Sequence, residues 1–164
     1  MGFIIMLFFA QLTRKKGEAM RIMGLDFGSK TVGVAVSDAL GLTACGIEII
    51  RRDSPNKIRK TLARIEQLID EYNIEKIVLG YPVMLDGSEG ERVEKTKEFA
   101  AMLERRTGMS VIFQDERLTT VEAYEIMDLA GIKKEDRYKY VDQIAAQVIL
   151  EDYMNCVENT EMNY

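Results

Sequence analysis

The chain has 164 residues and a formal net charge of −5, and hydrophobic residues make up 47% of it, as is typical of one globular domain. It contains no histidine, which excludes Ser-His-Asp catalysis, Cys-His catalysis and every metal site with a histidine ligand. The two cysteines, Cys45 and Cys156, are too few for a four-cysteine zinc site, and a reducing cytoplasm is the expected compartment.

The first 19 residues differ in composition from the rest of the chain. Residues 3–10 form an apolar run that is too short to span a bilayer, and no signal-peptide pattern surrounds it. Residues 16–18 can be encoded by purine-rich codons one codon before Met20, as a translated ribosome-binding site would be. We interpret residues 1–19 as a non-native or disordered extension; the alternative is a membrane-surface anchor. The remaining residues have a net charge of −7.

Three strands are predicted directly after this extension. A short apolar run that ends in an acid covers residues 21–26, a run rich in Val and Thr covers 31–37, and 42–50 is the third candidate; short turns join them. Strands joined in this way are typical of an antiparallel meander.

The spacing of apolar residues then changes to three or four, which predicts helices alternating with short strands. Ser54 is expected to be the N-cap of the first helix, with Pro55 at its first position, and Gly108 is expected to end the second. The predicted elements are a helix over 55–72, a strand over 76–80, a helix near 90–107, a strand over 110–114, a helix from Thr119 to Gly131, a charged loop over 133–139 and a helix over about 140–157. This order predicts an α/β fold, with a mixed five-stranded sheet flanked by helices.

Three acids lie where predicted elements end or begin, namely Asp26, Glu116 and Asp142. Ligands of open α/β sheets gather beyond the carboxyl ends of the strands, and converging carboxylates repel one another unless a cation lies between them. Mg²⁺ is bound by such groups together with water and substrate phosphates. Each acid also has a purely structural interpretation: a turn for Asp26, a solvated charge for Glu116 and a favourable helix-dipole position for Asp142.

The segments around these acids resemble the YqgF family of bacterial RNase H-like proteins, described as Holliday-junction-resolvase-like and as nucleases of precursor 16S ribosomal RNA. The string DFGSK at 26–30 and the string DERLTT at 115–120 together make the resemblance specific. The segments that carry it are 24–38, 77–82, 86–90, 115–123, 141–142, 145–146 and 149–150. The chain departs from the family at Met84, Glu91 and Gln143, where members often have Asn, Pro and Lys.

The resemblance implies an RNase H-like nuclease domain over residues 20–157, followed by a tail over 158–164. It implies that Asp26, Glu116 and Asp142 are catalytic carboxylates that bind Mg²⁺ or Mn²⁺, with Asp26 shared between two ions. The implied activity is metal-dependent hydrolysis of nucleic-acid phosphodiesters, which matures the 5′ end of precursor 16S rRNA in the cytoplasm. The implied partners are precursor rRNA and ribosomal precursor particles, and no membrane partner is implied. The protein is expected to be a monomer or a homodimer.

Two alternatives remain open at this point. The first is a Holliday junction resolvase, which would cut branched DNA as a dimer. The second is a non-catalytic nucleic-acid or ribosome-assembly factor that keeps the acids for folding. Metal-dependent cleavage separates the enzymes from the assembly factor, and a choice between precursor RNA and four-way DNA separates the two enzymes.

Basic residues near the acids are the candidates for substrate binding. Arg117 directly follows Glu116, and its alternative role is a structural ion pair. The cluster before Asp142 has Tyr138 and Tyr140 available for base stacking, and its alternative is a solvated loop. The full candidate set is Lys30, Arg117, Lys133, Lys134, Arg137 and Lys139. The acidic net charge opposes strong non-specific binding, so this basic rim would have to act locally.

Overall fold

The computed structural model describes residues 21–84, 89–116 and 119–161, with side chains as far as Glu158. The interpretation of residues 1–19 as an extension lies outside this range. The elements are β1 (Arg21–Phe27), β2 (Thr31–Ser37), β3 (Ala44–Arg51), α2 (Arg59–Tyr72), β4 (Ile74–Tyr81), α3 (Glu91–Thr107), β5 (Val111–Asp115), α4 (Thr119–Leu129), the 3₁₀ helix η1 (Lys134–Lys139) and α5 (Val141–Glu161).

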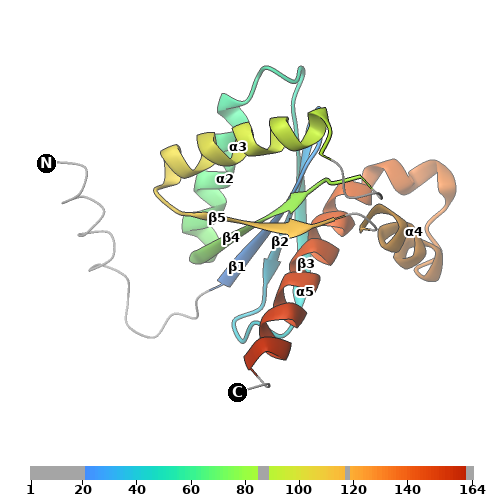
Figure 1. Cartoon of the computed structure of the whole chain (residues 1–164). Helices are drawn as coiled ribbons and strands as arrows, with labels where there is room; N and C mark the ends of the chain where they lie inside the picture. The colour runs from blue at the N-terminus through green and yellow to red at the C-terminus, as the bar shows by residue number, and fades with distance from the viewer. Residues whose placement is uncertain (1–20, 85–88, 117–118, 162–164) are drawn as a thin grey trace, which may run out of the picture.

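The strands form one mixed sheet in the order β3-β2-β1-β4-β5, as Figure 1 shows. β1, β2 and β3 are antiparallel neighbours, which confirms the predicted meander, and β4 pairs in parallel with both β1 and β5. The carboxyl ends of β1, β4 and β5 therefore lie at the same edge of the sheet. In Figure 1 this edge faces α4 and the beginning of α5.

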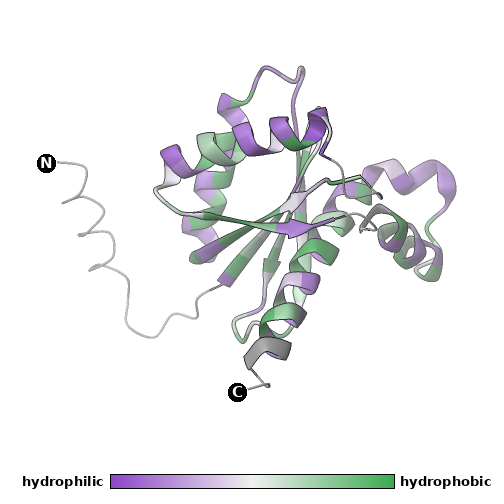
Figure 2. Cartoon of the chain, in the orientation of Figure 1, coloured by the Kyte–Doolittle hydropathy of each residue, from purple (hydrophilic) through white to green (hydrophobic). Residues whose placement is uncertain are grey.

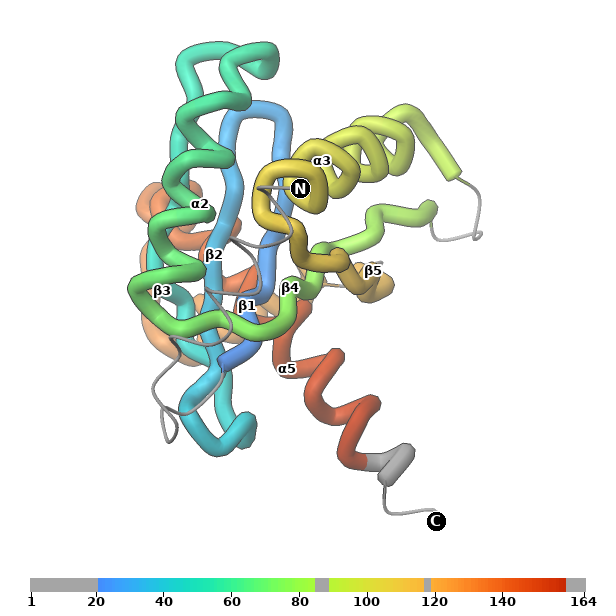
Figure 3. Tube along the Cα trace, turned by 90° about the vertical axis from the view of Figure 1, so that its left-hand side faces the viewer, coloured from blue at the N-terminus to red at the C-terminus, as the bar shows by residue number. Residues whose placement is uncertain are grey.

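Helices cover both faces of the sheet (Figures 1 and 3), and alternate residues of each strand serve the two faces. Met23 and Leu25 of β1 are buried in the core that α2 and α3 cover. Ile22 packs on the opposite face, in a second core with α5. Asp26 follows in the same alternation as Ile22, so the strand directs this acid toward the α5 face.

The helices bury the apolar stripes that their spacing predicts. In α3 the buried residues are Val93, Thr96, Phe99, Ala100 and Leu103, which follow the three- or four-residue spacing of a helix with one apolar face. Gly108 ends this helix in the left-handed conformation, with φ 70°, as predicted. Figure 2 shows the hydrophobic strands beneath these helices and the hydrophilic η1 outside the cores.

Two predicted helix boundaries and one predicted element type are wrong. The first helix begins at Arg59 with Ile58 as N-cap, because the backbone N–H of Lys57 donates to the carbonyl of Ser54 (3.1 Å) and closes a turn that uses Pro55. The charged loop is the 3₁₀ helix η1, and the last helix continues to Glu161 instead of ending at 157. Within the described residues, no helix is both long and apolar enough to span a membrane.

Candidate active site

Asp26 and Asp142 are brought together by a glycine on the neighbouring strand. Asp26 lies opposite Gly33 in the β1–β2 register. A Cβ atom on Gly33 would lie 1.8 Å from the carbonyl oxygen of Asp142, so only glycine allows the first turn of α5 to approach β2 this closely. Gly24, one alternation earlier on β1, similarly admits Leu150 and Ala146 of α5.

This close approach leads to a prediction for Gly33→Ala. The added methyl group must push the first turn of α5 away, and Asp142 with it. We expect a loss of about 1–3 kcal/mol in unfolding free energy. If Asp142 has the catalytic role that the family resemblance implies, the rate of nucleic-acid cleavage should also fall about 100-fold, because an ångström-scale misplacement of a reacting group has that effect. The matched control is Ala35→Gly on the same strand and face, which lowers stability without displacing α5. Equal cleavage rates in the two variants would contradict the prediction.

Glu116 is positioned by the ends of β4 and β5. It directly follows β5, and its backbone N–H donates to the carbonyl of Tyr81 at the end of β4 (3.3 Å). Its carboxylate fills the space above Gly80, where a Cβ atom would lie 2.2 Å from Oε2. The side chain is 9% exposed. Gly80 therefore lets a glutamate from the end of β5 extend over β4 toward β1.

The three acids are electrostatically linked through Asp26. Burial raises the pKa of Asp26 to about 7, and the negative charge of Asp142 adds to the rise. Burial raises the pKa of Glu116 to about 8, and there the charge of Asp26 adds to the rise. In both cases the nearby guanidinium of Arg92 lowers the pKa in part. Asp26 is thus the shared member of two acidic pairs, one with Asp142 and one with Glu116.

This donor set fits divalent ions that keep part of their hydration. Within the described residues, no group of three histidine, cysteine or acidic residues is arranged to hold an ion by itself. Mg²⁺ is commonly bound by one or two carboxylates, with water and substrate phosphates completing its shell. The two pairs that share Asp26 provide carboxylates in that number, and burial makes their shared negative charge costly without a cation.

Arg52 holds the turn that follows Asp26, and sequence reasoning missed it. Arg52 is 7% exposed, and its guanidinium donates to the carbonyls of Gly28 (2.6 Å) and Ser29 (2.9 Å). It also lies over the ring of Phe27, 4.9 Å from the centroid. Lys30 is exposed at the end of this turn. The only hint in the sequence is the Arg51-Arg52 pair, which does not reveal which arginine is buried.

Arg92 is the second residue that sequence reasoning missed. Its guanidinium lies 3.7 Å from Oε1 of Glu116, and the Arg92 side chain is 67% exposed. It lies in the first turn of α3, where the helix dipole disfavours a cation. A cation in the first turn of a helix is unusual, and residues that violate such local preferences are expected at functional sites. This was the signal in the sequence that could have identified Arg92.

A pocket of about 270 Å³ opens beside Glu116. The segment after β4 and the first turn of α3 line it, and Thr120 of α4 completes it. Met84 and Glu91, where the chain departs from the family pattern, both line this pocket. Glu91 forms an ion pair with Lys95 at 2.6 Å.

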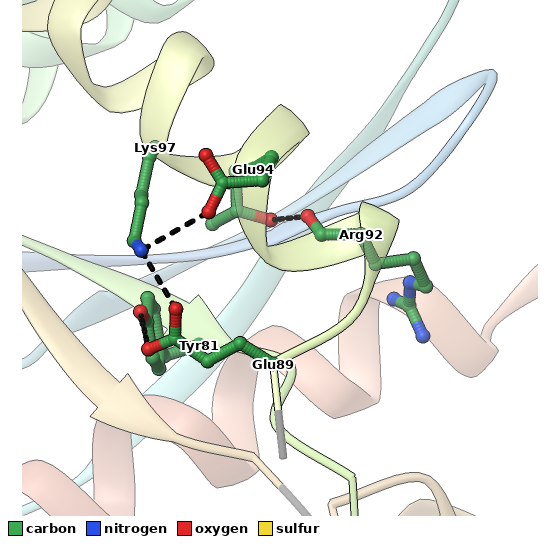
Figure 4. A network of polar contacts seen from close by, with 6 residues as sticks. Tyr81, Glu89, Arg92, Glu94 and Lys97 are labelled. Carbon is green, nitrogen blue, oxygen red and sulfur yellow. Dashed lines mark hydrogen bonds and ion pairs between the residues drawn. The ribbon is translucent and has the colours of Figure 1, made fainter.

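A polar network fixes the pocket wall that α3 provides (Figure 4). The hydroxyl of Tyr81 donates to Glu89 Oε1 (2.6 Å), and Lys97 donates to Glu89 Oε2 (2.8 Å) and to Glu94 (3.2 Å). These contacts join the end of β4 to α3. Figure 4 shows Arg92 pointing away from the network, so its guanidinium takes no part in it.

The predicted basic residues differ in their surroundings. Lys133 and Lys134 are exposed, and in the described part of the chain neither has an ion-pair partner. Arg137 is paired with Asp128 of α4 and lies over the ring of Tyr124, while Lys139 is paired with Asp136 at 2.6 Å. Arg117 lies outside the described residues.

Comparison with known proteins shows the family to which this chain belongs. Residues 20–156 match the model of the RuvX family, described as Holliday junction resolvase. The chain belongs to the RuvX family. This match, together with curated relatives named as nucleases of pre-16S rRNA, confirms the resemblance to the YqgF family.

Two bacterial relatives of this RuvX chain carry the name "Putative pre-16S rRNA nuclease". The protein from Agathobacter rectalis is 60% identical over 141 residues, which cover 86% of this chain and 99% of the relative. The protein from Streptococcus pyogenes serotype M49 is 46% identical over 137 residues, 83% of this chain and 98% of the relative.

Two solved structures share the fold of this RuvX chain. RuvC of T. thermophilus in complex with a Holliday junction substrate aligns with a TM-score of 0.53 at 14% identity, over 86% of this chain and 97% of that one. The fowlpox virus Holliday junction resolvase aligns with a TM-score of 0.52 at 18% identity, over 84% and 99%. These likenesses and the observed sheet confirm the predicted RNase H-like fold.

Proposed function

We propose that the chain is a divalent-metal-dependent nuclease that hydrolyses phosphodiester bonds near the 5′ end of precursor 16S rRNA. One observation carries this proposal. The ends of β1 and β5 and the start of α5 direct Asp26, Glu116 and Asp142 to one edge of the sheet, where burial and mutual repulsion raise the pKa values of Asp26 and Glu116. Carboxylates held together in this way suit phosphodiester hydrolysis without histidine.

Each acid has a proposed role in that reaction. Asp26 would hold two ions, Mg²⁺ or Mn²⁺, and Glu116 and Asp142 would each complete the protein ligands of one. Ions held there supply activation of water and stabilisation of the charge on the leaving oxygen. Gly33 and Gly80 allow the close approaches described above, which bring the acids near one another. The exposed Asp115 remains outside this set.

The substrate would approach along the basic residues around this edge. Lys30, Lys133 and Lys134 are exposed and suited to phosphate contacts. Arg137 and Lys139 remain proposed contacts that would exchange an existing carboxylate partner for a phosphate. Arg117 remains a proposed contact on sequence grounds. A protein that acts on precursor rRNA in ribosomal precursor particles would work in the cytoplasm.

The experiment is a cleavage assay with the purified full-length chain. Three substrates are compared: a precursor 16S rRNA fragment with its 5′ extension, mature 16S rRNA of the same region, and a four-way DNA junction. Each is incubated with Mg²⁺, with Mn²⁺ or with EDTA. We expect cleavage of the precursor fragment only, and only with a divalent ion. Cleavage that persists in EDTA would refute the metal-dependent mechanism.

A Holliday junction resolvase is the second candidate, because the matching family model carries that description. Resolution of a four-way junction needs two sites that act on two strands, so this candidate requires a homodimer. Symmetric cleavage of the junction, together with a dimer in analytical ultracentrifugation, would favour the resolvase over the rRNA nuclease. Tight binding of the precursor without cleavage would instead favour the non-catalytic assembly factor.

A further inference from the structure

The pocket beside Glu116 has two kinds of wall. Pro82, Val83 and Met84 form its apolar lining, and residue Met84 is 57% exposed. The rest of the lining includes the polar and charged residues Arg92, Thr120 and Glu116. A volume of about 270 Å³ lies just under the ~300–1,000 Å³ of drug-sized ligand sites, so the pocket suits one small unit of a polymer.

Arg92 is the one cation among the described residues that line this pocket. Its contact with Glu116, at 3.7 Å, is longer than a direct hydrogen bond, and most of its side chain is exposed. The exposed guanidinium is thus only loosely held by the buried Glu116, whereas a phosphate group can accept two parallel hydrogen bonds from it. A phosphate placed beside Glu116 can therefore draw Arg92 away from that carboxylate.

The backbone of Arg92 is held while its side chain is available. Its carbonyl accepts a hydrogen bond from the hydroxyl of Thr96 (2.8 Å), within the helix that the Tyr81–Glu89–Lys97 contacts fasten to β4. The neighbouring acid Glu91 already has a partner in Lys95, so its charge is partly neutralised. Figure 4 shows that the Arg92 guanidinium is directed away from these contacts.

We propose that this pocket binds one unpaired nucleotide of the substrate next to the scissile bond. Arg92 binds its phosphate, and the Pro82–Met84 wall contacts its base. The proposal rests on the proposed nuclease function, and it adds a requirement that the acids alone do not impose. A nucleotide can enter the pocket only if it is not stacked and paired in a duplex. The enzyme should therefore prefer substrates with an unpaired nucleotide at this position.

The first test measures RNA binding and its salt dependence. A cleavage assay with the wild-type chain first identifies a precursor fragment that is a substrate. Binding of this fragment is then measured with Mg²⁺ in an Asp142→Asn background, where the RNA should stay intact. We expect Arg92→Gln to weaken binding about tenfold, as for a lost hydrogen bond to a charged group. It should also lower the slope of log affinity against log salt by about 0.7, the value for one phosphate contact on a single strand.

The matched control is Arg105→Gln. Arg105 is exposed on the same helix, about 20 Å further along its axis, and the charge change is identical. This variant should keep the affinity and the salt slope of its parent. A purely structural role of Arg92 would change melting temperature without changing the salt slope. Equal slopes in Arg92→Gln and Arg105→Gln would overturn the phosphate assignment.

The second test concerns the base. Two RNA stems with the same cleaved strand are compared: one is fully paired, and in the other the opposite strand leaves a single nucleotide unpaired at the mapped cleavage position. We expect about fivefold or greater preference for the unpaired form, because a paired nucleotide must first be unstacked and unpaired, and Met84→Ser should remove most of this preference. Leu42→Ser, at the β2–β3 turn, removes a similarly exposed apolar side chain and should keep the preference.

The outcomes separate this inference from the proposed function. If the wild type cleaves precursor RNA but shows no preference for the unpaired stem, the pocket assignment is wrong and the nuclease function stands. If the wild type neither binds nor cleaves the RNA, the proposed function fails and the nucleotide pocket fails with it.

Discussion

Asp26→Asn is expected to lower the rate of precursor 16S rRNA cleavage by at least about a thousandfold, as are Glu116→Gln and Asp142→Asn. Asp26 interacts electrostatically with both other acids, so the three groups should act as one unit. A double variant should then cost little more than a single one, because the first substitution has already disabled the unit. Single-turnover cleavage with saturating enzyme measures this directly.

The controls for this experiment are neighbouring acids. Asp115→Asn changes an exposed carboxylate next to Glu116 and should lower the rate less than about tenfold, as expected for a group outside a functional unit. Asp86→Asn, which lies outside the described residues, should have a similarly small effect. Amides keep the shape of the acids, so RNA binding should survive in every variant. Near-wild-type cleavage by Asp26→Asn would favour the non-catalytic assembly factor.

The second large effect concerns the stability of the metal-free protein. The pKa of Asp26 rises from 3.8 to about 7 on folding, and that of Glu116 from 4.5 to about 8. The folded state therefore binds protons more strongly than the unfolded state between about pH 4 and pH 8. This contribution to stability is fully present below about pH 4, and it is lost as the pH rises through 7 to 8.

We therefore expect the unfolding free energy of the wild type in EDTA to fall between pH 5 and pH 8. Asp26→Asn should remove much of this dependence, and at pH 8 it should stabilise the metal-free protein by about 2–4 kcal/mol. Urea unfolding of both proteins at each pH measures the difference. Glu122 and Asp152 also have raised pKa values, but both proteins retain them, so they do not affect the comparison.

Divalent ions should reverse the same effect. Millimolar Mg²⁺ or Mn²⁺ at pH 8 should raise the melting temperature of the wild type, because an ion that binds only the folded state stabilises it. The same addition should leave Asp26→Asn nearly unchanged. An equal rise in both proteins would show that the ions bind elsewhere, and the proposed metal-binding role of the acids would be wrong.

Local patterns in the sequence were sufficient for most of the elements. The meander at 21–50 follows from short apolar or β-branched runs joined by short turns, and the buried face of α3 follows from its three- and four-residue spacing. The exceptions lie where a local signal supports two structures. Ser54 and Pro55 are compatible with a helix start and with a turn. In the structure they form the turn, which the hydrogen bond from Lys57 to Ser54 closes.

For the candidate site, the sequence indicated the acids but not their relation to the surrounding cations. Asp26, Glu116 and Asp142 could be selected because each lies at the end or beginning of an element, and the family resemblance assigned them a common role. Which cations accompany them depends on contacts between distant segments. Arg92 lies beside Glu116 because α3 and β5 both adjoin β4, and no local pattern contains that pairing.

By itself, the sequence determined the order of strands and helices, the absence of histidine chemistry and the membership of a nuclease-related family. The first two depend on composition and local periodicity, and the third on the resemblance of the strings at 26–30 and 115–120 to a known family. Only the tertiary structure decided how closely the acids approach and what lies between them. Gly33 leaves room for Asp142, and Gly80 leaves room for Glu116. The sequence does not show this, because the role of a glycine depends on which distant segment packs against it. For the same reason the pocket formed by the segment after β4, α3 and Thr120 could not be predicted, since its walls are separate in sequence and meet only in the folded chain.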